Sequence, residues 1–263
     1  MKIERIWVGN SGRNFNYLIA CPETGDALAI DPLDAGAVLA AAGRYGWRIT
    51  QIVNTHEHGD HTGGNAAVVA ATGARVLAHT GNVGRIPGVD AGLSNGDEVV
   101  VGRSVRLTVL DTPGHTLAHA CLFAGGDTPA LFCGDTLFNA GAGNCHFGGH
   151  PAKLFETFSN VLAKLPAETR VYPGHEYLAR NLAFTLDREP GNTRAAKLLV
   201  EAESHDPARA RVTTLFQETG INTFFRLGES EVVAGLRDAI PGFSGQPSQR
   251  DVFLALRKLR NNW

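Results

Sequence analysis

Three histidines and one aspartate lie close together in the segment Thr55–His61. Neutral imidazoles and carboxylates are the ligands that zinc and iron prefer in proteins. The segment follows residues 48–53, which predict a strand, so successive side chains can point toward two different metal ions. The segment predicts a metal site, with a solvated polar loop as the alternative. The four side chains are His56, His58, Asp60 and His61.

Three further residues of metal-binding types follow predicted strands elsewhere in the chain. His115 lies in Thr-Pro-Gly-His-Thr, Asp135 in Cys-Gly-Asp-Thr, and His175 in Tyr-Pro-Gly-His-Glu. Loops at the ends of strands are a common position for functional side chains, because a rigid scaffold holds them there. All three residues therefore argue against the solvated-loop interpretation and predict that one centre collects distant parts of the chain.

Apolar periodicity and turn residues predict alternating strands and helices before residue 176. Gly46 is expected to end the first helix and Pro151 to begin the third, while residues 134–150 are glycine-rich and expected to be irregular. The predicted helices cover residues 35–46, 64–72 and 151–164. The predicted strands cover residues 2–8, 15–20, 27–31, 48–53, 75–79, 98–101, 104–110, 118–123, 130–133 and 169–172.

The remainder of the chain contains few strand signals and several helical ones. Asp206 is expected to cap one of these helices, just before Pro207. We therefore predict a mixed α/β domain at residues 1–175 and a small helical domain at residues 176–263. The predicted helices cover residues 176–188, 193–205, 207–218, 229–239 and 249–260.

Composition and charge narrow the class of protein. The 263 residues are 43% hydrophobic and 19% charged, with a net charge of −2. This balance predicts no basic surface for nucleic acid. The sequence contains no run of about eighteen apolar residues, so we expect no membrane-spanning helix. The first residues lack the apolar segment of a signal peptide, so we expect a cytoplasmic protein. The four cysteines are too widely spaced for a disulfide framework or a zinc-binding Cys-x-x-Cys pair.

Four short motifs together resemble one family. They read His-x-His-x-Asp-His from His56, Pro-Gly-His-Thr around His115, Gly-Asp-Thr-Leu-Phe around Asp135 and Gly-His-Glu-Tyr around His175. The combination is highly specific and resembles the metallo-β-lactamase superfamily, and within it the glyoxalases II, which are hydroxyacylglutathione hydrolases. The resemblance covers nearly the whole chain. It implies an α/β fold, the αββα metallo-β-lactamase sandwich, followed by a small C-terminal α-helical domain.

The same resemblance implies two divalent metal ions per chain, with zinc expected first and iron or manganese as alternatives. Asp135 would bridge the two ions, and Asp60 and Asp135 would be catalytic as well as metal-binding. The implied ligands are His56, His58 and His115 for the first ion and Asp60, His61 and His175 for the second.

Residues of the helical tail and the loops beside the metal site are implied to bind glutathione. Arg257 and Arg260, spaced i and i+3 on a basic helix, would bind its carboxylates; a solvated helix face is the alternative. Tyr177 matches a substrate-contacting tyrosine of the family. Many glyoxalases II have a basic residue in place of Asn144 and an aromatic residue in place of His146, so this chain departs from the family at the contact to the glycine carboxylate.

Two divalent ions about 3.5–4 Å apart can activate a water and polarise a carbonyl together. A thioester suits such a site, because a thiol leaves as a thiolate and needs little help from a general acid. We therefore expect a monomeric enzyme that cleaves S-D-lactoylglutathione to D-lactate and glutathione. The alternatives are a hydrolase of another thioester or lactone, a single-iron oxygenase similar to glutathione persulfide dioxygenases, and a nucleic-acid-processing relative with the same fold.

Other polar residues have weaker signals. Asp31 resembles an aspartate that orients metal ligands; the alternative is a carboxylate at the start of the next helix. His79 and His119 are expected to be ordinary sheet residues, and His205 a surface residue. His150 is left open between a functional and a structural role, and Cys145 is expected to be a free thiol without a role.

Overall fold

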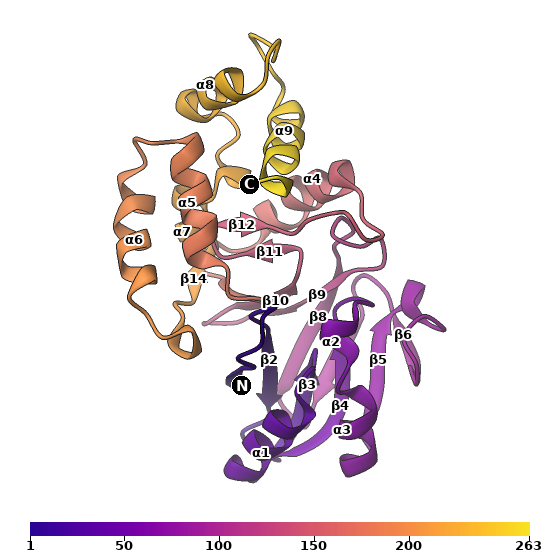
Figure 1. Cartoon of the computed structure of the whole chain (residues 1–263). Coiled ribbons are helices and arrows are strands. Elements are labelled where there is room, and N and C mark those ends of the chain that lie inside the picture. The colour runs from indigo at the N-terminus through magenta and orange to yellow at the C-terminus, as the bar shows by residue number, and fades with distance from the viewer.

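The computed structural model describes residues 1–263 and contains two six-stranded sheets (Figure 1). In the first sheet the strand order is β1-β2-β3-β4-β5-β6. The pairs β1–β2 and β2–β3 are antiparallel, whereas β3, β4, β5 and β6 run parallel to one another. The strands are β1 (Lys2–Trp7), β2 (Phe15–Ala20), β3 (Asp26–Ile30), β4 (Arg48–Asn54), β5 (Arg75–His79) and β6 (Ala91–Leu93).

The second sheet has the order β14-β13-β10-β9-β8-β7. Its pairs are antiparallel except for β10 and β13, which run parallel. The strands are β7 (Glu98–Val101), β8 (Val105–Asp111), β9 (Ala120–Ala124), β10 (Ala130–Gly134), β13 (Arg170–Pro173) and β14 (Thr213–Thr214).

The alternation of side chains along β2 explains why the two sheets pack together. Phe15, Tyr17 and Ile19 point into a cluster of 20 buried residues that also contains side chains from the second sheet, such as Leu107 and Phe132. Successive residues of a strand face opposite sides of the sheet. The whole of β2 is buried, so both faces of the first sheet must be covered.

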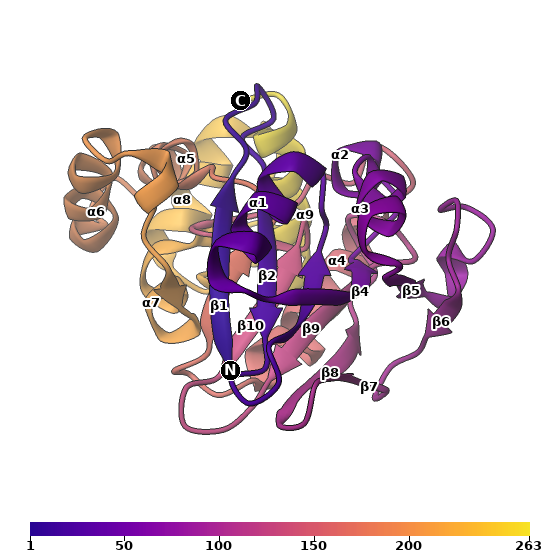
Figure 2. The ribbon, with the colours of Figure 1, turned by 90° about the horizontal axis from the view of Figure 1, so that it is seen from below.

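Helices cover the outer faces of both sheets (Figure 2). Leu18 and Ile52 pack against α1 (Ala35–Tyr45) and α3 (Asn65–Thr72) on the first sheet. On the second sheet, α4 (Pro151–Asn160) packs with the C-terminal helices. The layers are helix, sheet, sheet and helix, which confirms the predicted αββα sandwich. As predicted, α1 ends at Gly46, which has the left-handed φ of 66° typical of a helix C-cap.

The C-terminal helices share a hydrophobic core with the second sheet. Phe184 and Phe253 lie in one buried cluster with Leu131 and Phe158. The boundary at residue 176 stays a prediction, since this core is continuous across it. The helices are α5 (Leu178–Arg188), α6 (Thr193–Glu203), α7 (Leu215–Ile221), α8 (Ser230–Ala239) and α9 (Gln249–Asn261).

The predicted helix at 207–218 is wrong. Asp206 does cap Ala208, but only the short 3₁₀ turn Pro207–Arg209 follows. The chain then forms β14 at the edge of the second sheet, where Arg170 and Val171 pair with Thr214 and Thr213. A capping box begins α7, in which the Thr214 and Gln217 side chains bind each other's backbone N–H groups. Pairing with a distant strand therefore outweighs the local helical pattern.

A two-stranded hairpin lies between the sheets and the helical region (Figure 1). It consists of β11 (Leu137–Phe138) and β12 (Gly141–Ala142), within the stretch that the sequence predicts to be irregular. No helix of the structure has both the length and the apolar character needed to cross a membrane. All four cysteines are free thiols.

Candidate metal centre

The predicted metal residues all follow the ends of strands, and the fold brings them together. Residues 55–61 follow β4, where the short helix α2 (Gly59–Thr62) turns His61 back under the strand. There the side chain of Asn54 donates a hydrogen bond to the carbonyl of His61 (3.0 Å). The other three residues follow β8, β10 and β13 and come from the second sheet. The centre therefore lies where loops at one edge of the first sheet meet loops at the neighbouring edge of the second sheet.

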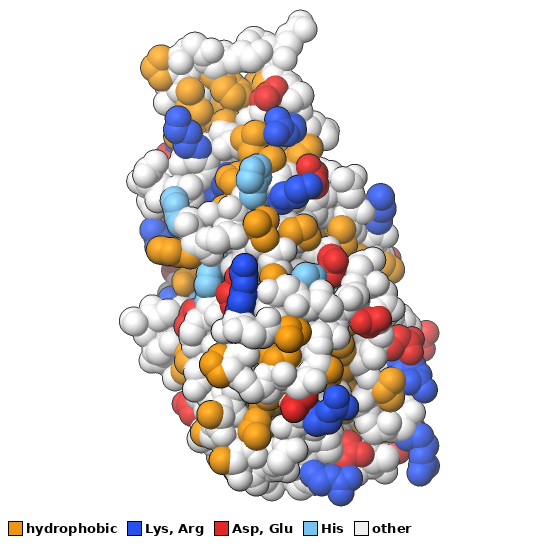
Figure 3. Space-filling view, turned by 90° about the vertical axis from the view of Figure 1, so that its right-hand side faces the viewer, with side chains coloured by type: hydrophobic (Ala, Val, Ile, Leu, Met, Phe, Trp, Pro, Cys, Tyr) orange, Lys and Arg blue, Asp and Glu red, His pale blue; other side chains and the backbone are white.

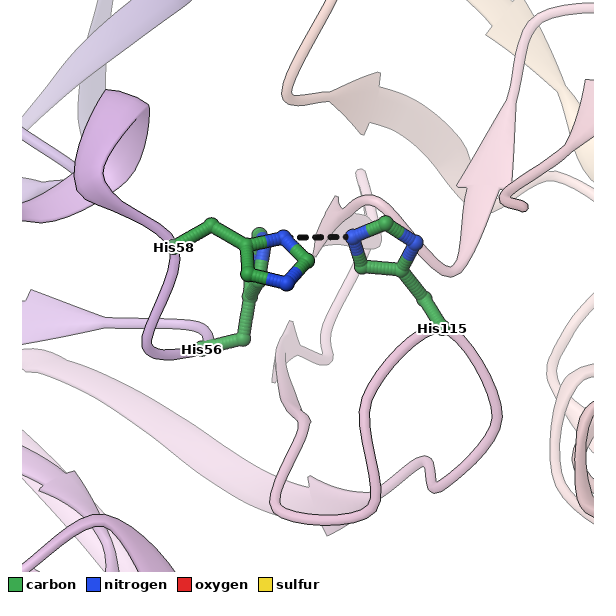
Figure 4. Close-up of side chains that lie close together, drawn as sticks. All are labelled: His56, His58 and His115. Atoms are coloured by element: carbon green, nitrogen blue, oxygen red, sulfur yellow. Dashed lines mark hydrogen bonds between the residues drawn. The ribbon is translucent and has the colours of Figure 1, made fainter. Parts of the chain in front are cut away.

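His56, His58 and His115 form the first group (Figure 4). His58 Nδ1 lies 3.1 Å from His56 Nε2 and 3.0 Å from His115 Nε2. His56 and His115 are buried, while His58 is partly exposed. Three ring nitrogens thus converge from two loops that are 57 residues apart in the sequence.

Asp60, His61 and His175 form the second group. His61 Nε2 lies 3.2 Å from His175 Nε2. Asp60 Oδ2 lies 3.7 Å from the first of these nitrogens and 3.5 Å from the second. Both histidines are buried, but the Asp60 side chain is 46% exposed, so this group is open to solvent on the aspartate side.

Asp135 lies between the two groups. Its Oδ2 is 3.4 Å from His115 Nε2 and 3.3 Å from His175 Nε2, and its Oδ1 is 3.4 Å from His61 Nε2. The buried Oδ1 has no hydrogen-bond partner. A buried, unpartnered carboxylate oxygen is costly unless a cation or another donor compensates it. A metal ion beside this oxygen would provide that compensation.

The two ligand groups together contain five histidines. Each of them contacts a hydrogen-bond acceptor with the ring nitrogen that faces away from the centre. An outer nitrogen that donates its proton leaves a lone pair on the inner nitrogen, so the inner nitrogens repel one another unless a cation lies between them. Tetrahedral zinc with Zn–N bonds of 2.0–2.1 Å separates two nitrogens by about 3.3 Å, close to the separations observed. These donors therefore fit divalent metal ions. The outer contacts are His56 Nδ1 with Thr55 Oγ1 (3.0 Å), His58 Nε2 with Phe147 O (3.0 Å), His115 Nδ1 with Asn144 O (2.7 Å), His61 Nδ1 with Asp31 Oδ2 (2.9 Å) and His175 Nδ1 with Gly12 O (2.6 Å).

The electrostatics of the centre favour cations. Burial raises the pKa of Asp135, but the imidazoles of His175, His61 and His115 outweigh it and hold this pKa well below its usual value. Burial lowers the pKa of His61, but the carboxylates around it, Asp135 first, raise it to about 9. The site thus attracts either protons or metal ions to the same nitrogens, and metal binding would release the protons.

Asp31 orients the loop of residues 55–61, which carries four of the metal-type side chains. It is buried, and its φ of 48° is left-handed, a strained conformation for a residue other than glycine. Asp31 Oδ1 accepts a hydrogen bond from the Thr55 N–H (2.8 Å), and Oδ2 accepts from Thr55 Oγ1 (2.7 Å) and His61 Nδ1 (2.9 Å). The alternative role at a helix N-terminus is wrong, because Asp34 caps α1.

His119 is a residue of the centre that the sequence analysis missed. It precedes β9 and is buried directly beneath the centre, so its assignment as an ordinary sheet residue is wrong. Its Nε2 accepts a hydrogen bond from the Asp135 N–H (3.2 Å), and its Nδ1 lies 2.9 Å from Thr112 Oγ1. The ring stacks on His56 at 5.1 Å. Its position four residues after His115 was the available signal.

The other histidines lie at the margin or outside. His79 ends β5 and its Nδ1 accepts from the Gly81 N–H, as expected for a sheet residue. His205 is exposed at the end of α6, also as predicted. His150 precedes α4 and its side chain makes no cap hydrogen bond.

Comparison with known proteins identifies the family. A family model described as the metallo-beta-lactamase superfamily matches residues 13–175, and one described as the hydroxyacylglutathione hydrolase C-terminus matches residues 176–263. A hydroxyacylglutathione hydrolase of Nitrosococcus oceani is 60% identical over 263 residues, the whole of both chains. The chain belongs to the hydroxyacylglutathione hydrolase family. The family predicted from the motifs is confirmed.

Further members of this family are similar along almost the whole chain. The hydroxyacylglutathione hydrolase of a Polaromonas species is 58% identical over 263 residues, again the whole of both chains. An Arabidopsis thaliana protein named cytoplasmic hydroxyacylglutathione hydrolase is 32% identical over 255 residues, 95% of each chain.

Solved structures support the fold. The crystal structure of ETHE1 from Myxococcus xanthus is 25% identical, with a TM-score of 0.69, and the match covers 99% of this chain and 98% of that one. TTHA1623 in a di-iron-bound form is also 25% identical, with a TM-score of 0.61, and the match covers 84% of this chain and 99% of the other.

In this member of the hydroxyacylglutathione hydrolase family, a cavity of about 240 Å³ borders the metal residues, because its lining residues Asn144 and Tyr177 contact His115 and His175. All five residues predicted to bind substrate line it: Asn144, His146, Tyr177, Arg257 and Arg260. On the face shown in Figure 3, histidine side chains and several basic side chains lie at mid-height. Arg180, which the sequence analysis did not select, also lines the cavity. The fold thus joins a cationic cavity to the metal centre.

The two arginines of α9 differ in their surroundings. Arg257 is buried, and its Nη1 donates to the carbonyls of Ala142 (2.6 Å) and Gly143 (3.0 Å). Arg260 is partly exposed, and its Nη2 donates to Asn181 Oδ1 (3.1 Å). The solvated-face alternative is therefore wrong for Arg257, and Arg260 has more donors free toward the cavity.

Proposed function

We propose that this enzyme, a thioester hydrolase, cleaves S-D-lactoylglutathione and related S-2-hydroxyacylglutathiones at a two-metal centre, in the last step of methylglyoxal detoxification. One observation supports this most directly: two groups of metal-type ligands share Asp135 and open beside a cavity lined by arginines. The curated relatives named hydroxyacylglutathione hydrolase, which match this chain over its full length, support the same reaction.

The ligands that we propose follow the two groups. Asp135 would contact both ions, and the solved neighbour TTHA1623 was crystallised with two irons. Zinc is our first choice of metal, with iron or manganese as alternatives, since the donor set suits all three. When bound, the two ions supply Lewis-acid activation of water and of the substrate carbonyl. The first ion would be held by His56, His58 and His115, and the second by Asp60, His61 and His175.

The protein residues would hold the reactants and move one proton. Asp60 carries the most exposed carboxylate of the centre: its side chain is 46% exposed, and its Oδ2 accepts a hydrogen bond from Asn14 Nδ2 (3.2 Å). We propose that this carboxylate receives the proton of the attacking water. The thiol of glutathione leaves as a thiolate, so no further protein acid is needed.

The cavity residues would bind the glutathione part of the substrate. Arg260 offers a guanidinium to a carboxylate, and Asn144 and His146 lie on the opposite loop of the same cavity. Tyr177 stacks on His175, with ring centroids 5.1 Å apart, so it links the cavity to the metal centre. We further propose that the protein acts as a monomer. We also propose a cytoplasmic location, which the name of the Arabidopsis relative supports.

We expect metal-replete protein to hydrolyse S-D-lactoylglutathione, and the loss of thioester absorbance measures the reaction. Metal analysis of the same sample should give about two ions per chain. No turnover of this substrate, with turnover of a lactone instead, would contradict the assignment. Oxygen consumption with glutathione persulfide and one iron per chain would support the single-iron oxygenase.

We expect Arg260→Ala mainly to raise KM, with little change in kcat, because this contact to the thiol carrier is the same in ground and transition states. A charge-assisted hydrogen bond is worth about 1.5–3 kcal/mol, so the rise is roughly ten- to hundredfold. Lys258→Ala, on the exposed side of the same helix, is the matched control and should leave KM unchanged. Equal KM values for both variants would remove Arg260 from the binding site.

A further inference from the structure

Four buried polar side chains of the helical region bind the backbone of residues 139–143. This segment contains the turn between β11 and β12 and leads to Asn144. We call the four residues the buried polar cluster. Their side chains contact consecutive residues of the segment: Asn181 Nδ2 donates to Asn139 O (3.0 Å), the Ala140 N–H donates to Glu218 Oε2 (2.9 Å), Asn222 Nδ2 donates to Gly141 O (3.1 Å), and Arg257 Nη1 donates to Ala142 O and Gly143 O (2.6 and 3.0 Å).

Glu218 is the central member of this cluster. It is fully buried, on α7, and accepts hydrogen bonds from three groups: Thr213 Oγ1 (2.6 Å), Asn222 Nδ2 (2.9 Å) and the N–H of Ala140. Burial raises its pKa to about 7, although these hydrogen bonds lower it. A buried carboxylate contributes little net stability compared with an apolar residue of the same size. Its partners therefore suggest a specific role for Glu218 other than filling the core.

The partner of Glu218 is an unusual piece of backbone. Ala140 has a φ of 57°, in the left-handed region that residues other than glycine rarely adopt. It is almost completely buried, so its N–H group has no access to water. The hydrogen bond to Glu218 both satisfies this group and holds the turn in its strained conformation.

The same segment continues into the metal centre. The Gly143 N–H donates to Thr136 O (3.2 Å), and a Cβ atom at Gly143 would lie 1.8 Å from the carbonyl oxygen of Asp135, so the backbone at Gly143 and at residues 135–136 is in close contact. The next residue, Asn144, accepts the hydrogen bond from His115 Nδ1 (2.7 Å). A small movement of residues 139–143 would therefore turn the imidazole of His115 and shift Asp135.

We propose that Glu218 is a positioning residue for the metal centre, which acts by holding the Ala140 turn and thereby the acceptor of His115. This inference depends on the two-metal centre proposed above. It also gives the helical region a second role besides binding glutathione: its buried side chains set the geometry of ligands that belong to the sandwich.

The test compares Glu218→Leu and Glu218→Gln with the unaltered full-length protein. Leucine removes the acceptor for Ala140. Glutamine keeps one oxygen for Ala140 but loses the second carboxylate oxygen, which accepts from Thr213 and helps to hold the side chain in place. Glu203→Gln on the exposed end of α6 is the matched control. Metal affinity is measured by competition with a chelator, and thermal unfolding is followed with and without metal. Both readouts are independent of turnover.

We expect Glu218→Leu to weaken metal binding about tenfold and to reduce the rise in Tm that metal produces. This is the lower end of the ten- to hundredfold cost of losing a direct hydrogen-bond partner of a ligand, because Glu218 acts on His115 through residues 140–144 and does not contact it. Glu218→Gln should weaken binding roughly two- to tenfold, because loss of the hydrogen bond from Thr213 weakens the hold of this side chain on Ala140. Glu203→Gln should bind metal like the unaltered protein. If Glu218→Leu does not fold, the glutamine variant decides the question.

A purely structural role predicts a different result. In that case Tm would fall equally with and without metal, and the metal affinity of each folded variant would stay within about twofold of the unaltered protein, less than one hydrogen bond is worth. That result would overturn the inference while the proposed function stands. If the unaltered protein itself binds no metal, the proposed function and this inference are both wrong.

Discussion

Asp135→Ala is expected to abolish hydrolysis and to weaken the binding of both metal ions. Asp135 lies within 3.4 Å of nitrogens from both ligand groups, and its pKa is held well below its usual value, so it supplies a negative charge to both sites. Loss of an outer-shell partner already costs about ten- to hundredfold, so we expect a loss of kcat/KM greater than a hundredfold for this shared ligand. Turnover and metal content per chain are the measurements.

Two variants control this prediction. Asp127→Ala removes a carboxylate from the exposed turn just before β10 and should retain full activity and metal content. Asp135→Asn keeps the size of the side chain but removes its charge, and we expect it to bind metal weakly. If Asp135→Asn retained both ions and normal turnover, the negative charge of Asp135 would not be needed.

His175→Ala is expected to remove one metal ion preferentially. His175 Nε2 lies 3.2 Å from His61 Nε2 in the second group, whereas the first group contains no atom of His175. We therefore expect the metal content to fall from about two ions per chain to about one, and kcat to fall at least a hundredfold, since two ions act together in such a centre. Elemental analysis after gel filtration, together with kcat, tests this.

The surface variant His205→Ala serves as the control, because it also removes an imidazole but at an exposed position. A His175→Ala protein with two ions and near-normal kcat would show that the proposed division of ligands is wrong. Loss of both ions would instead show that the second group is required for the first to bind, through the shared Asp135.

Much of the sandwich could be predicted because its strands have strong local patterns. The alternation along β2 and the glycine after α1 determine strand and helix ends through local physics, so the predicted boundaries agree with the structure to within a few residues. The helix predicted at 207–218 failed where local physics was insufficient. Thr213 and Thr214 pair with β13, more than forty residues away. The local pattern of apolar residues carries no information about such a distant contact.

The metal residues could be selected from the sequence for two reasons. Four of them, three histidines and one aspartate, lie within six residues, and the other three each follow a predicted strand. The residues that support them could not be selected in this way. His115 and His119 are four residues apart in one loop, yet one points into the centre and the other binds the N–H of Asp135 from below. Asp31 and Asp34 are likewise neighbours, and only the tertiary structure assigns one to the metal loop and the other to the cap of α1.

The sequence by itself determined the family, the fold class and the residue types available for chemistry. Local periodicity, caps and short motifs are properties of neighbouring residues, so they can be found without a structure. Only the tertiary structure decided that Arg257 is held by backbone carbonyls while Arg260 keeps donors free toward the cavity, and which buried carboxylate binds the Ala140 turn. Those assignments depend on contacts between segments that are tens of residues apart, and a buried polar group is defined by its partners rather than by its neighbours in the chain.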